Sequence, residues 1–432
     1  MKTLAIIGSG ISGLAVANLL NKKYDIEIFE KESTPGGLIR CKTINDNLFH
    51  ICGGHVFNTK REDVMNFFSE KFDFENDFIK SERNSCVFFE NGEVTNPVKR
   101  SLFVKNTSWV EGVPYPIENH VHMLKPEIQH SFINDIEKIT KSRHRREPKN
   151  FEEFLKWNFG ETLYKIYFKP YNEKIWHTNL KKIPLSWLKG KLPMPSIEEI
   201  LYNNFNHIKD KTFVHSNFWY PKKNGSQFIA NKLAENQNIN FNSEIKEIKK
   251  INNKWIINNK KFDIVFFCGN IKDLNNILQI EEFEKYKNFI NNLEYHGTTT
   301  VFCEIDKNSY SWIYLPSTNY QSHRIICTGN FSPENNNTKQ LTATIEFTDQ
   351  ISEEEILQNL SKMPLHPRYL THEYHKYTYP IQNNDTREKI KEIKEELSQQ
   401  QFYMSGRFVD WEYYNMDIAV GAVKDTIEKN KL

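Results

Sequence analysis

The first forty residues restrict the fold more than any other part of the chain. An apolar strand at 3–7 leads into Gly8, Gly10 and Gly13, which are spaced as G-x-G-x-x-G. Apolar residues then recur at helical spacing from 11 to 22. In this arrangement the first glycine allows a tight turn, the second lets the backbone approach a pyrophosphate, and the third lets the helix pack closely on the strand. The segment therefore predicts a dinucleotide site at the helix N-terminus, with a ligand-free glycine turn as the alternative.

The strand that follows, DIEIFEK, is closed by Glu30. A carboxylate at this position accepts hydrogen bonds from the adenosine ribose hydroxyls. Ser12, beside the glycine turn, is assigned to the same cofactor site. A second glycine pair, Gly36 and Gly37, offers another place where backbone can lie against a cofactor. Flavoproteins of the amine-oxidase and glutathione-reductase type carry a similar pair, and this resemblance favours FAD over NAD.

The stretch FHICGGHVFN, 49–58, places Gly53 and Gly54 directly before His55. One explanation is a tight turn with a structural histidine. The other is that a flat ligand lies against this backbone and that His55 stands beside its reactive edge. The stretch alone leaves both explanations open.

Length, charge and cysteine spacing exclude several classes of protein. A chain of 432 residues predicts two or three domains, and a net charge of +2 gives no electrostatic reason to expect nucleic acid. The basic run at 141–147 is interpreted as a solvated loop. No apolar segment approaches the ~18–20 residues that span a bilayer, and the six cysteines show no metal-binding spacing. We therefore expect a cytoplasmic protein with free thiols, no membrane span and no metal.

Periodicity places further elements along the chain. Helices are expected at 61–80, 126–140, 151–168 and 224–237 and at the C-terminus, and strands within 83–118 and at 264–267, 298–305, 311–315, 323–328 and 340–347. Asn91-Gly92 is predicted to be the turn of a hairpin. The buried strand at 264–267 returns the chain to the first sheet.

Nine stretches in order resemble the UDP-galactopyranose mutase family, and more closely its eukaryotic-type branch than its short bacterial one. They are GSGISGL, TPGGL, GGHVF, VPYPIENHVHML, FKPYNEKIW, WIYLP, RIICTGNFSP, YTYP and GRFVDWEYYNMD. The resemblance implies reduced FAD and a covalent flavin N5–sugar intermediate, through which the pyranose and furanose forms of an NDP-sugar are interconverted.

The expected fold is α/β, with a discontinuous FAD-binding Rossmann-like domain, a helical insertion and a mixed β-sheet substrate domain. The FAD domain comprises 1–60, 222–285 and 398–432, the sheet domain 61–118 and 286–397, and the helical insertion 119–221. A cleft over the cofactor would lie between them.

The resemblance also assigns site residues. His55 and Arg324 are the expected catalytic residues, because the family histidine lies near the flavin N5 and the family arginine contacts the diphosphate. The implied substrate-binding residues are Tyr115, Glu118, Lys169, Asn172, Trp176, Tyr314, Tyr379, Tyr413 and Asn415. The implied cofactor-binding residues are Gly8, Gly10, Ser12, Gly13, Glu30, Gly36, Gly37, Gly53, Gly54, His55, Gly406, Arg407, Asn415, Met416 and Asp417. Lys169 stands where the family has a second arginine, so it keeps the charge and loses the bidentate fork.

Ile117 and Glu118 depart from the aromatic and glutamine of the uridine-type members. An ionised carboxylate only accepts hydrogen bonds and faces the uracil carbonyls badly, whereas guanine offers adjacent N1–H and N2–H donors. Glu118 therefore suggests a shift from UDP toward GDP, unless its side chain points to solvent or pairs with a lysine.

Two other functions fit the same glycine fingerprint. One is an FAD-dependent oxidase of the amine or protoporphyrinogen oxidase type, and the other is a non-enzymatic binder resembling the Rab GDP-dissociation inhibitors. The partners implied by the mutase resemblance are a UDP- or GDP-linked sugar and an external reductant such as NAD(P)H. A homo-oligomer is compatible with the sequence.

Overall fold

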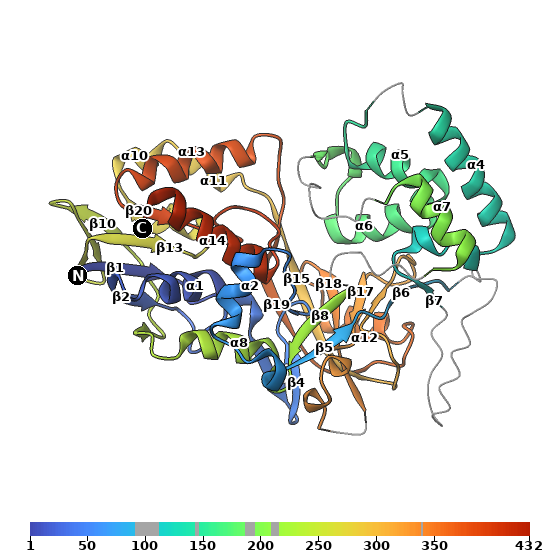
Figure 1. Ribbon diagram of the computed structural model, residues 1–432, viewed down its shortest axis with the longest axis horizontal. Coiled ribbons are helices and arrows are strands. Elements are labelled where there is room, and N and C mark those ends of the chain that lie inside the picture. The colour runs from blue at the N-terminus through green and yellow to red at the C-terminus, as the bar shows by residue number, and fades with distance from the viewer. Residues whose placement is uncertain (91–111, 143–146, 186–194, 209–215, 338–339) are drawn as a thin grey trace.

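The computed structural model describes residues 1–90, 112–142, 147–185, 195–208, 216–337 and 340–432. A five-stranded parallel sheet in the order β20-β13-β1-β2-β9 forms one lobe, which also holds both termini (Figure 1). Its strands are β1 (Lys2–Ile7), β2 (Tyr24–Phe29), β9 (Ile239–Asn240), β13 (Ile264–Phe267) and β20 (Phe402–Met404). The sheet thus combines segments from the start, middle and end of the chain. The expected α/β fold with a parallel Rossmann-like sheet is confirmed.

Helices cover both faces of this sheet. One face packs against α1 (Ile11–Leu20), α8 (Gly225–Ala234) and α14 (Met416–Asn430), and α2 (Glu62–Ser69) adds to the same core. The other face packs against α9 (Ile271–Ile277), α11 (Lys287–Asn291) and α13 (Thr386–Ser398). A small sheet in the order β12-β11-β10-β14 completes that second core through Trp255 and Phe262. Its strands are β10 (Ile248–Ile251), β11 (Lys254–Ile257), β12 (Lys260–Phe262) and β14 (Leu278–Gln279), and α10 (Glu281–Glu284) follows.

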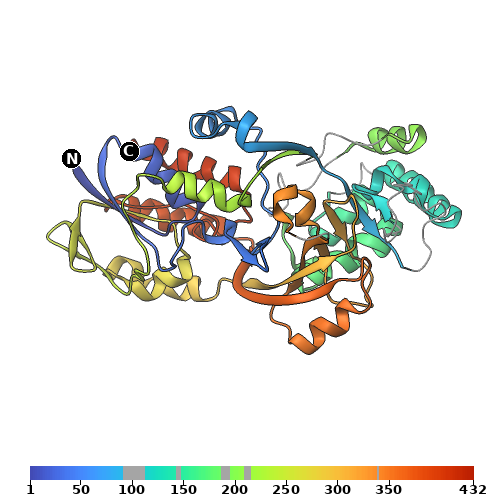
Figure 2. The ribbon, with the colours of Figure 1, turned by 90° about the horizontal axis from the view of Figure 1, so that it is seen from below.

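A seven-stranded mixed sheet forms the second part of the molecule, in the order β19-β15-β18-β17-β16-β6-β7. Its strands are β6 (Ser85–Phe88), β7 (Gly112–Pro114), β15 (Tyr295–Ile305), β16 (Trp312–Tyr314), β17 (Arg324–Ile326), β18 (Leu341–Thr348) and β19 (Arg368–Pro380). Only β6 and β16 pair in parallel. Figure 2 shows how the long β15 and β19 connect this sheet with the dinucleotide lobe. The remaining elements are the hairpin β3 (Cys41–Ile44) and β4 (Asn47–His50), the pair β5 (Phe78–Glu82) and β8 (Asn217–Pro221), and α12 (Glu353–Leu360).

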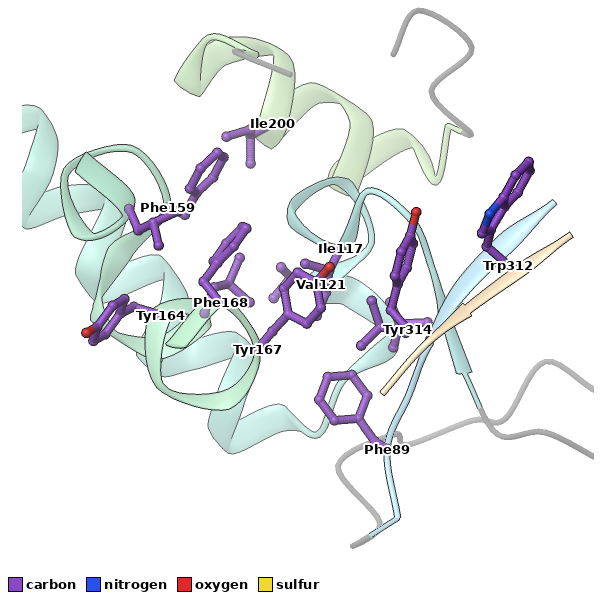
Figure 3. Close-up of a cluster of buried hydrophobic side chains, with 14 of the residues drawn as sticks. Phe89, Ile117, Val121, Phe159, Tyr164, Tyr167, Phe168, Ile200, Trp312 and Tyr314 are labelled. Atoms are coloured by element: carbon purple, nitrogen blue, oxygen red, sulfur yellow. The ribbon is translucent and has the colours of Figure 1, made fainter. Parts of the chain in front are cut away.

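The third part is helical and comprises α4 (Pro126–Ser142), α5 (Phe151–Leu163), a π-helix at Tyr164–Phe168, α6 (Lys169–Trp176) and α7 (Ile197–Asn206). Its aromatic core continues onto the mixed sheet, since Tyr167 and Phe168 gather on the side where β16 presents Tyr314 (Figure 3). Gly160 breaks α5 with φ 82°. Asp135 Oδ2 then accepts hydrogen bonds from the backbone N–H and hydroxyl of Thr162, at 2.7 and 2.6 Å, and so caps the next turn. The helix expected at 151–168 is present, but it is kinked at Gly160 and continues as the π-helix.

Several other expectations need correction. The helix expected over 61–80 ends early, because after α2 and the short α3 (Phe74–Asp77) the chain enters β5. Strand β19 was not predicted, since its partly exposed positions carry charged residues and blur the apolar alternation. The hairpin turn Asn91-Gly92 and most of the basic run at 141–147 lie outside the described residues. All six cysteines are free thiols, and no helix among the described residues has the length and apolar content needed to cross a membrane. The domain boundaries remain a proposal.

Candidate active site

A cavity of about 850 Å³ opens at the carboxyl ends of β1, β2 and β13. Gly8, with φ +96°, makes the turn after β1. A Cβ on Gly13 would lie 1.9 Å from the Gly8 carbonyl oxygen, so only glycine lets α1 pack against this turn. Gly10 has ordinary extended backbone, with φ −67° and ψ 177°, and lies on the cavity wall. Gly8 therefore serves the turn and Gly13 the helix packing, as expected from their spacing, and the role of Gly10 in cofactor approach stays a prediction.

The second glycine pair lies directly beside the first on the wall of this cavity. The Gly36 N–H donates to the Ser9 carbonyl oxygen at 2.9 Å, and Gly10 and Gly36 form a parallel β-bridge. A Cβ on Gly37 would lie 3.3 Å from the Gly10 Cα, so side chains here would fill the gap between the two strands of backbone. This is the narrow, side-chain-free passage that a pyrophosphate needs.

Glu30 is the acid at the end of β2, and it is buried. Its Oε2 accepts hydrogen bonds from the backbone N–H and the hydroxyl of Ser9, both at 2.7 Å. Its Oε1 accepts the Glu32 N–H at 3.0 Å. A carboxylate oxygen has a second lone pair, so Oε1 can also accept from a ribose hydroxyl. The residues at this end of the cavity fit a dinucleotide.

The opposite end of the cavity is lined by His55, Arg407, Asn415 and Met416. Asn415 is the residue before α14, but its side chain makes no capping hydrogen bond. The helix N-terminus thus directs its positive end toward the cavity. This settles part of the ambiguity left by the sequence, because Asn415 is not an ordinary helix cap.

His55 lies on the cavity wall, and its Nε2 is buried without a hydrogen-bond partner among the described residues. Burial, and then the positive charge of Arg407, lower the pKa of His55 to about 4. The imidazole is therefore neutral at physiological pH. Nε2 itself has almost no accessible surface and would lie 3.5 Å from a Cβ on Gly53, so it faces its own loop rather than the open cavity.

The two glycines before His55 have different tasks. Gly53 has φ +74°, and its N–H donates to Glu346 Oε1 at 2.8 Å. A Cβ on Gly54 would lie 2.7 Å from the Ile326 side chain, so Gly54 allows the loop to pack against β17. Neither glycine lines the cavity. The two glycines therefore serve packing and turn geometry, while His55 lines the cavity.

Of the expected cofactor residues, ten line the cavity: Gly8, Gly10, Ser12, Glu30, Gly36, Gly37, His55, Arg407, Asn415 and Met416. Asp417 does not line it, and its carboxyl interacts with Thr59. Gly406, with φ +139°, packs near Ser12 behind the cavity wall. The sequence reasoning missed Ile245 and Lys246 and the Cys268–Asn270 turn, which also line the cavity. The glycine that ends the apolar strand at 264–267 was the available signal for that turn.

Arg324 lies at the start of β17, beside the glycine–histidine loop. It pairs through Nε with Glu346 Oε2 and donates from Nη2 to the Tyr379 hydroxyl at 3.2 Å. Tyr379 stacks on Tyr413 with ring centroids 5.2 Å apart, and the Arg407 guanidinium lies 4.1 Å from the centre of the Tyr413 ring. Although burial lowers the pKa of Arg324, Glu346 raises it well above its ordinary value. A permanent cation and two phenols therefore stand next to the cofactor cavity.

Helix α6 supplies other expected substrate residues. Trp176 meets the edge of Tyr379, with ring centroids 5.9 Å apart. The side-chain amide of Asn172 donates to the Phe168 carbonyl oxygen at 2.7 Å. Lys169, the first residue of α6, is exposed, which does not support its expected contact with the diphosphate.

The remaining expected residues lie between the mixed sheet and the helical part. The rings of Tyr115 and Tyr314 lie 4.9 Å apart, and Arg83 donates to the Tyr314 hydroxyl while its guanidinium lies 4.4 Å from the centre of the Trp312 ring. Arg83 was missed by the sequence reasoning, because a lone arginine between two strands carries no motif. Glu118 is buried with 2% of its surface exposed, so it does not point to solvent.

The parallel sheet and the cavity at its carboxyl edge have the form of a Rossmann-like dinucleotide-binding domain. A model of the NAD(P)-binding Rossmann-like domain matches residues 6–70. More particularly, the chain is related to pyranose–furanose mutases. It is 24% identical to the dTDP-fucopyranose mutase of Escherichia coli over 71% of this chain and 74% of that one. It is 26% identical to a Klebsiella pneumoniae protein named "Probable UDP-galactopyranose mutase", over 56% and 55% of the two chains.

The solved structures agree on the fold. A reduced UDP-galactopyranose mutase superposes with a TM-score of 0.83 at 20% identity, over 99% of this chain and 94% of that one. Putrescine oxidase bound to putrescine superposes with a TM-score of 0.61 at 13% identity, over 99% and 98%. The relatives named above are bacterial, which gives no support to the eukaryotic-type branch.

Proposed function

We propose that the chain is a flavin-dependent mutase that interconverts the pyranose and furanose forms of a nucleoside-diphosphate sugar. The observation that carries this proposal is the position of Arg324. Its carboxylate partner Glu346 also accepts from the backbone of the His55 loop, so a cation suited to a diphosphate is built into the wall beside the cofactor cavity. The relatives that act on dTDP- and UDP-linked sugars support the same reading.

FAD is the cofactor that we propose. The paired glycine strands, the buried Glu30 and a cavity of about 850 Å³ whose lining includes Lys246 and His55 all suit a dinucleotide with a large ring system. When bound in its reduced form, FAD supplies the nucleophile for the anomeric carbon, so that the reaction has no net redox change. The N-terminus of α14 favours the negative charge of the reduced ring.

The protein's own groups have three tasks in this reaction. Arg324 remains charged and holds the departing diphosphate through N–H groups that Glu346 and Tyr379 do not occupy. The Tyr379 hydroxyl accepts from Arg324 and keeps its own proton to donate to a phosphate oxygen. His55 lines the cavity with a neutral imidazole, which offers an uncharged ring to the bound group.

An FAD-dependent oxidase is the second candidate, because putrescine oxidase shares the fold. Such an enzyme binds an apolar or cationic substrate and needs no arginine beside its cavity, so Arg324 favours the mutase. A binding protein that has lost its flavin is disfavoured by the open glycine passage and by Glu30, whose Oε1 can still accept a ribose hydroxyl.

The test is a product analysis with the purified full-length protein. The protein should be yellow, and after anaerobic reduction with dithionite it should convert at least one pyranose from a panel of UDP-, dTDP- and GDP-sugars into its furanose. The oxidised protein is the control and should be inactive. A colourless protein after reconstitution with FAD refutes the proposal, as does stoichiometric peroxide release with an amine.

The base preference is a finer part of the proposal. We propose that Glu118 selects guanine, because a buried carboxylate accepts the adjacent N1–H and N2–H donors. The pyrimidine nucleotides of the two bacterial relatives point the other way. Binding of GDP against UDP and dTDP separates the two alternatives.

A further inference from the structure

Two histidines and an aspartate meet where the end of α6 reaches the mixed sheet. His177 follows the last residue of α6, His296 lies in β15, and Asp349 follows β18. Asp349 Oδ2 lies 3.1 Å from His177 Nδ1 and 2.8 Å from His296 Nδ1. The three residues lie outside the cofactor cavity, and the side chains of His177 and Asp349 are 47% and 39% exposed. One ligand atom from each lies within 4.8 Å of the others.

Each of the three is held in place by its surroundings. His296 Nε2 lies 2.7 Å from the Trp176 carbonyl oxygen. The Gly297 N–H donates to Asp349 Oδ1 at 3.0 Å, which leaves Oδ2 turned toward both histidines. His177 and Asp349 have left-handed backbone, with φ 40° and 63°. A carbonyl behind a histidine and a donor behind a carboxylate are the outer partners that orient metal ligands.

The orientation of the His296 ring places Nδ1 against the carboxylate of Asp349. A carbonyl oxygen only accepts, so Nε2 carries the proton, and in a neutral ring Nδ1 then carries a lone pair. That lone pair faces a carboxylate oxygen, and the same oxygen faces a nitrogen of His177. A protonated His296 and a neutral His177, each donating from Nδ1 to Oδ2, would satisfy both contacts without a metal. A single divalent cation also satisfies all three ligand atoms at once.

We propose that His177, His296 and Asp349 bind one first-row transition-metal ion, with Zn²⁺ as the best match. Two imidazole nitrogens and one carboxylate oxygen are a common zinc ligand set, and water completes the tetrahedron because the site faces solvent. With metal–ligand bonds of about 2.0–2.1 Å, tetrahedral ligand atoms lie about 3.3 Å apart. The two contacts at 2.8 and 3.1 Å therefore need to open by only a few tenths of an ångström.

The ion would fasten α6 to the sheet beside the candidate active site. Trp176 precedes His177 and meets Tyr379, which pairs with His296 in the register of β15 and β19. A metal at this corner therefore holds the end of the helix that carries Asn172 and Trp176. The assignment of the ion itself rests on the three ligands alone and does not depend on the proposed function.

The test is a titration of the full-length, chelator-treated protein with Zn²⁺, followed by isothermal calorimetry, and with Co²⁺, followed by its visible d–d absorption. We expect one ion per chain and a tetrahedral Co²⁺ spectrum. H177Q and D349N should each weaken binding by at least about 100-fold, more than the loss of an outer partner typically costs. Mg²⁺ should not compete, because the nitrogen ligands disfavour it.

A matched control is H366Q. His366 Nδ1 lies 2.7 Å from Asp306 Oδ2, so it is a surface histidine–aspartate pair without a second histidine in the same cluster. H366Q should bind Zn²⁺ like the unchanged protein. Circular dichroism of each variant confirms folding, and the exposed position of His177 makes H177Q the safest of the ligand variants. The proposal is overturned by an absence of stoichiometric binding, or by binding that H177Q and D349N leave unchanged.

Discussion

Arg324 and Glu346 are direct register partners on the antiparallel strands β17 and β18. The guanidinium Nε pairs with Glu346 Oε2, while Glu346 Oε1 accepts the Gly53 N–H at 2.8 Å. One buried carboxylate thus joins the cation of the candidate substrate site to the loop that carries His55. Although burial raises the pKa of Glu346, Arg324 and His323 lower it far below its ordinary value, so the carboxylate stays ionised.

E346Q should destabilise the protein by roughly 3–5 kcal/mol, because it leaves a largely buried guanidinium without its counter-charge. The measurement is urea unfolding at neutral pH. The control is E304Q, whose partner Arg368 is half exposed at 3.6 Å and should change stability by less than about 1 kcal/mol. Equal effects of the two substitutions would contradict a special role for the buried pair.

R324K should weaken nucleoside-diphosphate binding by roughly 10–100-fold. Lysine keeps the charge but cannot pair with Glu346 and reach Tyr379 while also presenting a fork to the phosphate. Calorimetry with UDP and GDP measures the change. R368K, an arginine substitution at the exposed end of β19, should bind both nucleotides like the unchanged protein. Affinities of R324K within twofold of the unchanged protein would remove Arg324 from the diphosphate site.

Alanine substitutions at Gly10 and Gly13 should have different effects on stability and on FAD affinity. A Cβ on Gly10 meets only the Gly37 Cα at 4.0 Å, so G10A should leave the apoprotein's stability within about 1 kcal/mol. It should nevertheless lower FAD affinity at least about tenfold, because its methyl group enters the phosphate passage. G13A should destabilise the apoprotein by about 3 kcal/mol or more, because its Cβ meets the Gly8 carbonyl oxygen at 1.9 Å. Fluorescence titration with FAD and thermal melts separate these effects, and FAD binding by G10A at full strength would contradict the assignment of the passage.

Acid should destabilise the fold through His50. This residue is fully buried, its Nε2 lies 2.8 Å from the Tyr220 hydroxyl, and burial, followed by the charge of His55, lowers its pKa to about 3. Between about pH 6.5 and 3 the unfolded chain binds a proton that the folded chain does not, so the free energy of unfolding falls as pH decreases through this range. The loss amounts to up to about 5 kcal/mol.

Urea unfolding of the full-length protein across pH 7 to 4 measures this slope. H50Q keeps a hydrogen-bonding side chain and should flatten the pH dependence, whereas H130Q, at an exposed position on α4, should not change it. An unchanged slope in H50Q would assign the acid sensitivity to other groups.

E118Q tests the base preference. An amide can donate to a pyrimidine carbonyl and accept its N–H, so E118Q should shift the ratio of UDP to GDP affinity toward UDP by roughly 10-fold or more. Competition binding with both nucleotides reports the ratio. The nucleotide affinity of a variant substituted at an unrelated position serves as the reference. If the unchanged protein already prefers UDP, Glu118 does not select guanine.

The local pattern of the sequence was sufficient to predict the glycine-lined passage of the candidate dinucleotide site. Gly8, Gly10 and Gly13 have positions dictated by backbone geometry within a single βαβ unit, so their spacing carried the prediction. The roles of Gly53 and Gly54 could not be predicted in this way. A side chain at Gly54 would clash with Ile326, a residue more than 250 positions away in the sequence. The break of α5 at Gly160 likewise depends on Asp135 from another helix.

By itself, the sequence determined which backbone could bend and approach a ligand, because glycine spacing and apolar periodicity act over a few residues. The tertiary structure alone decided which charges meet. Arg324 with Glu346, Arg83 with Tyr314, and His177 with His296 and Asp349 come from separate strands and helices. Their contacts arise from strand register and from the packing of α6 on the sheet, and such long-range geometry leaves no periodic trace along the chain.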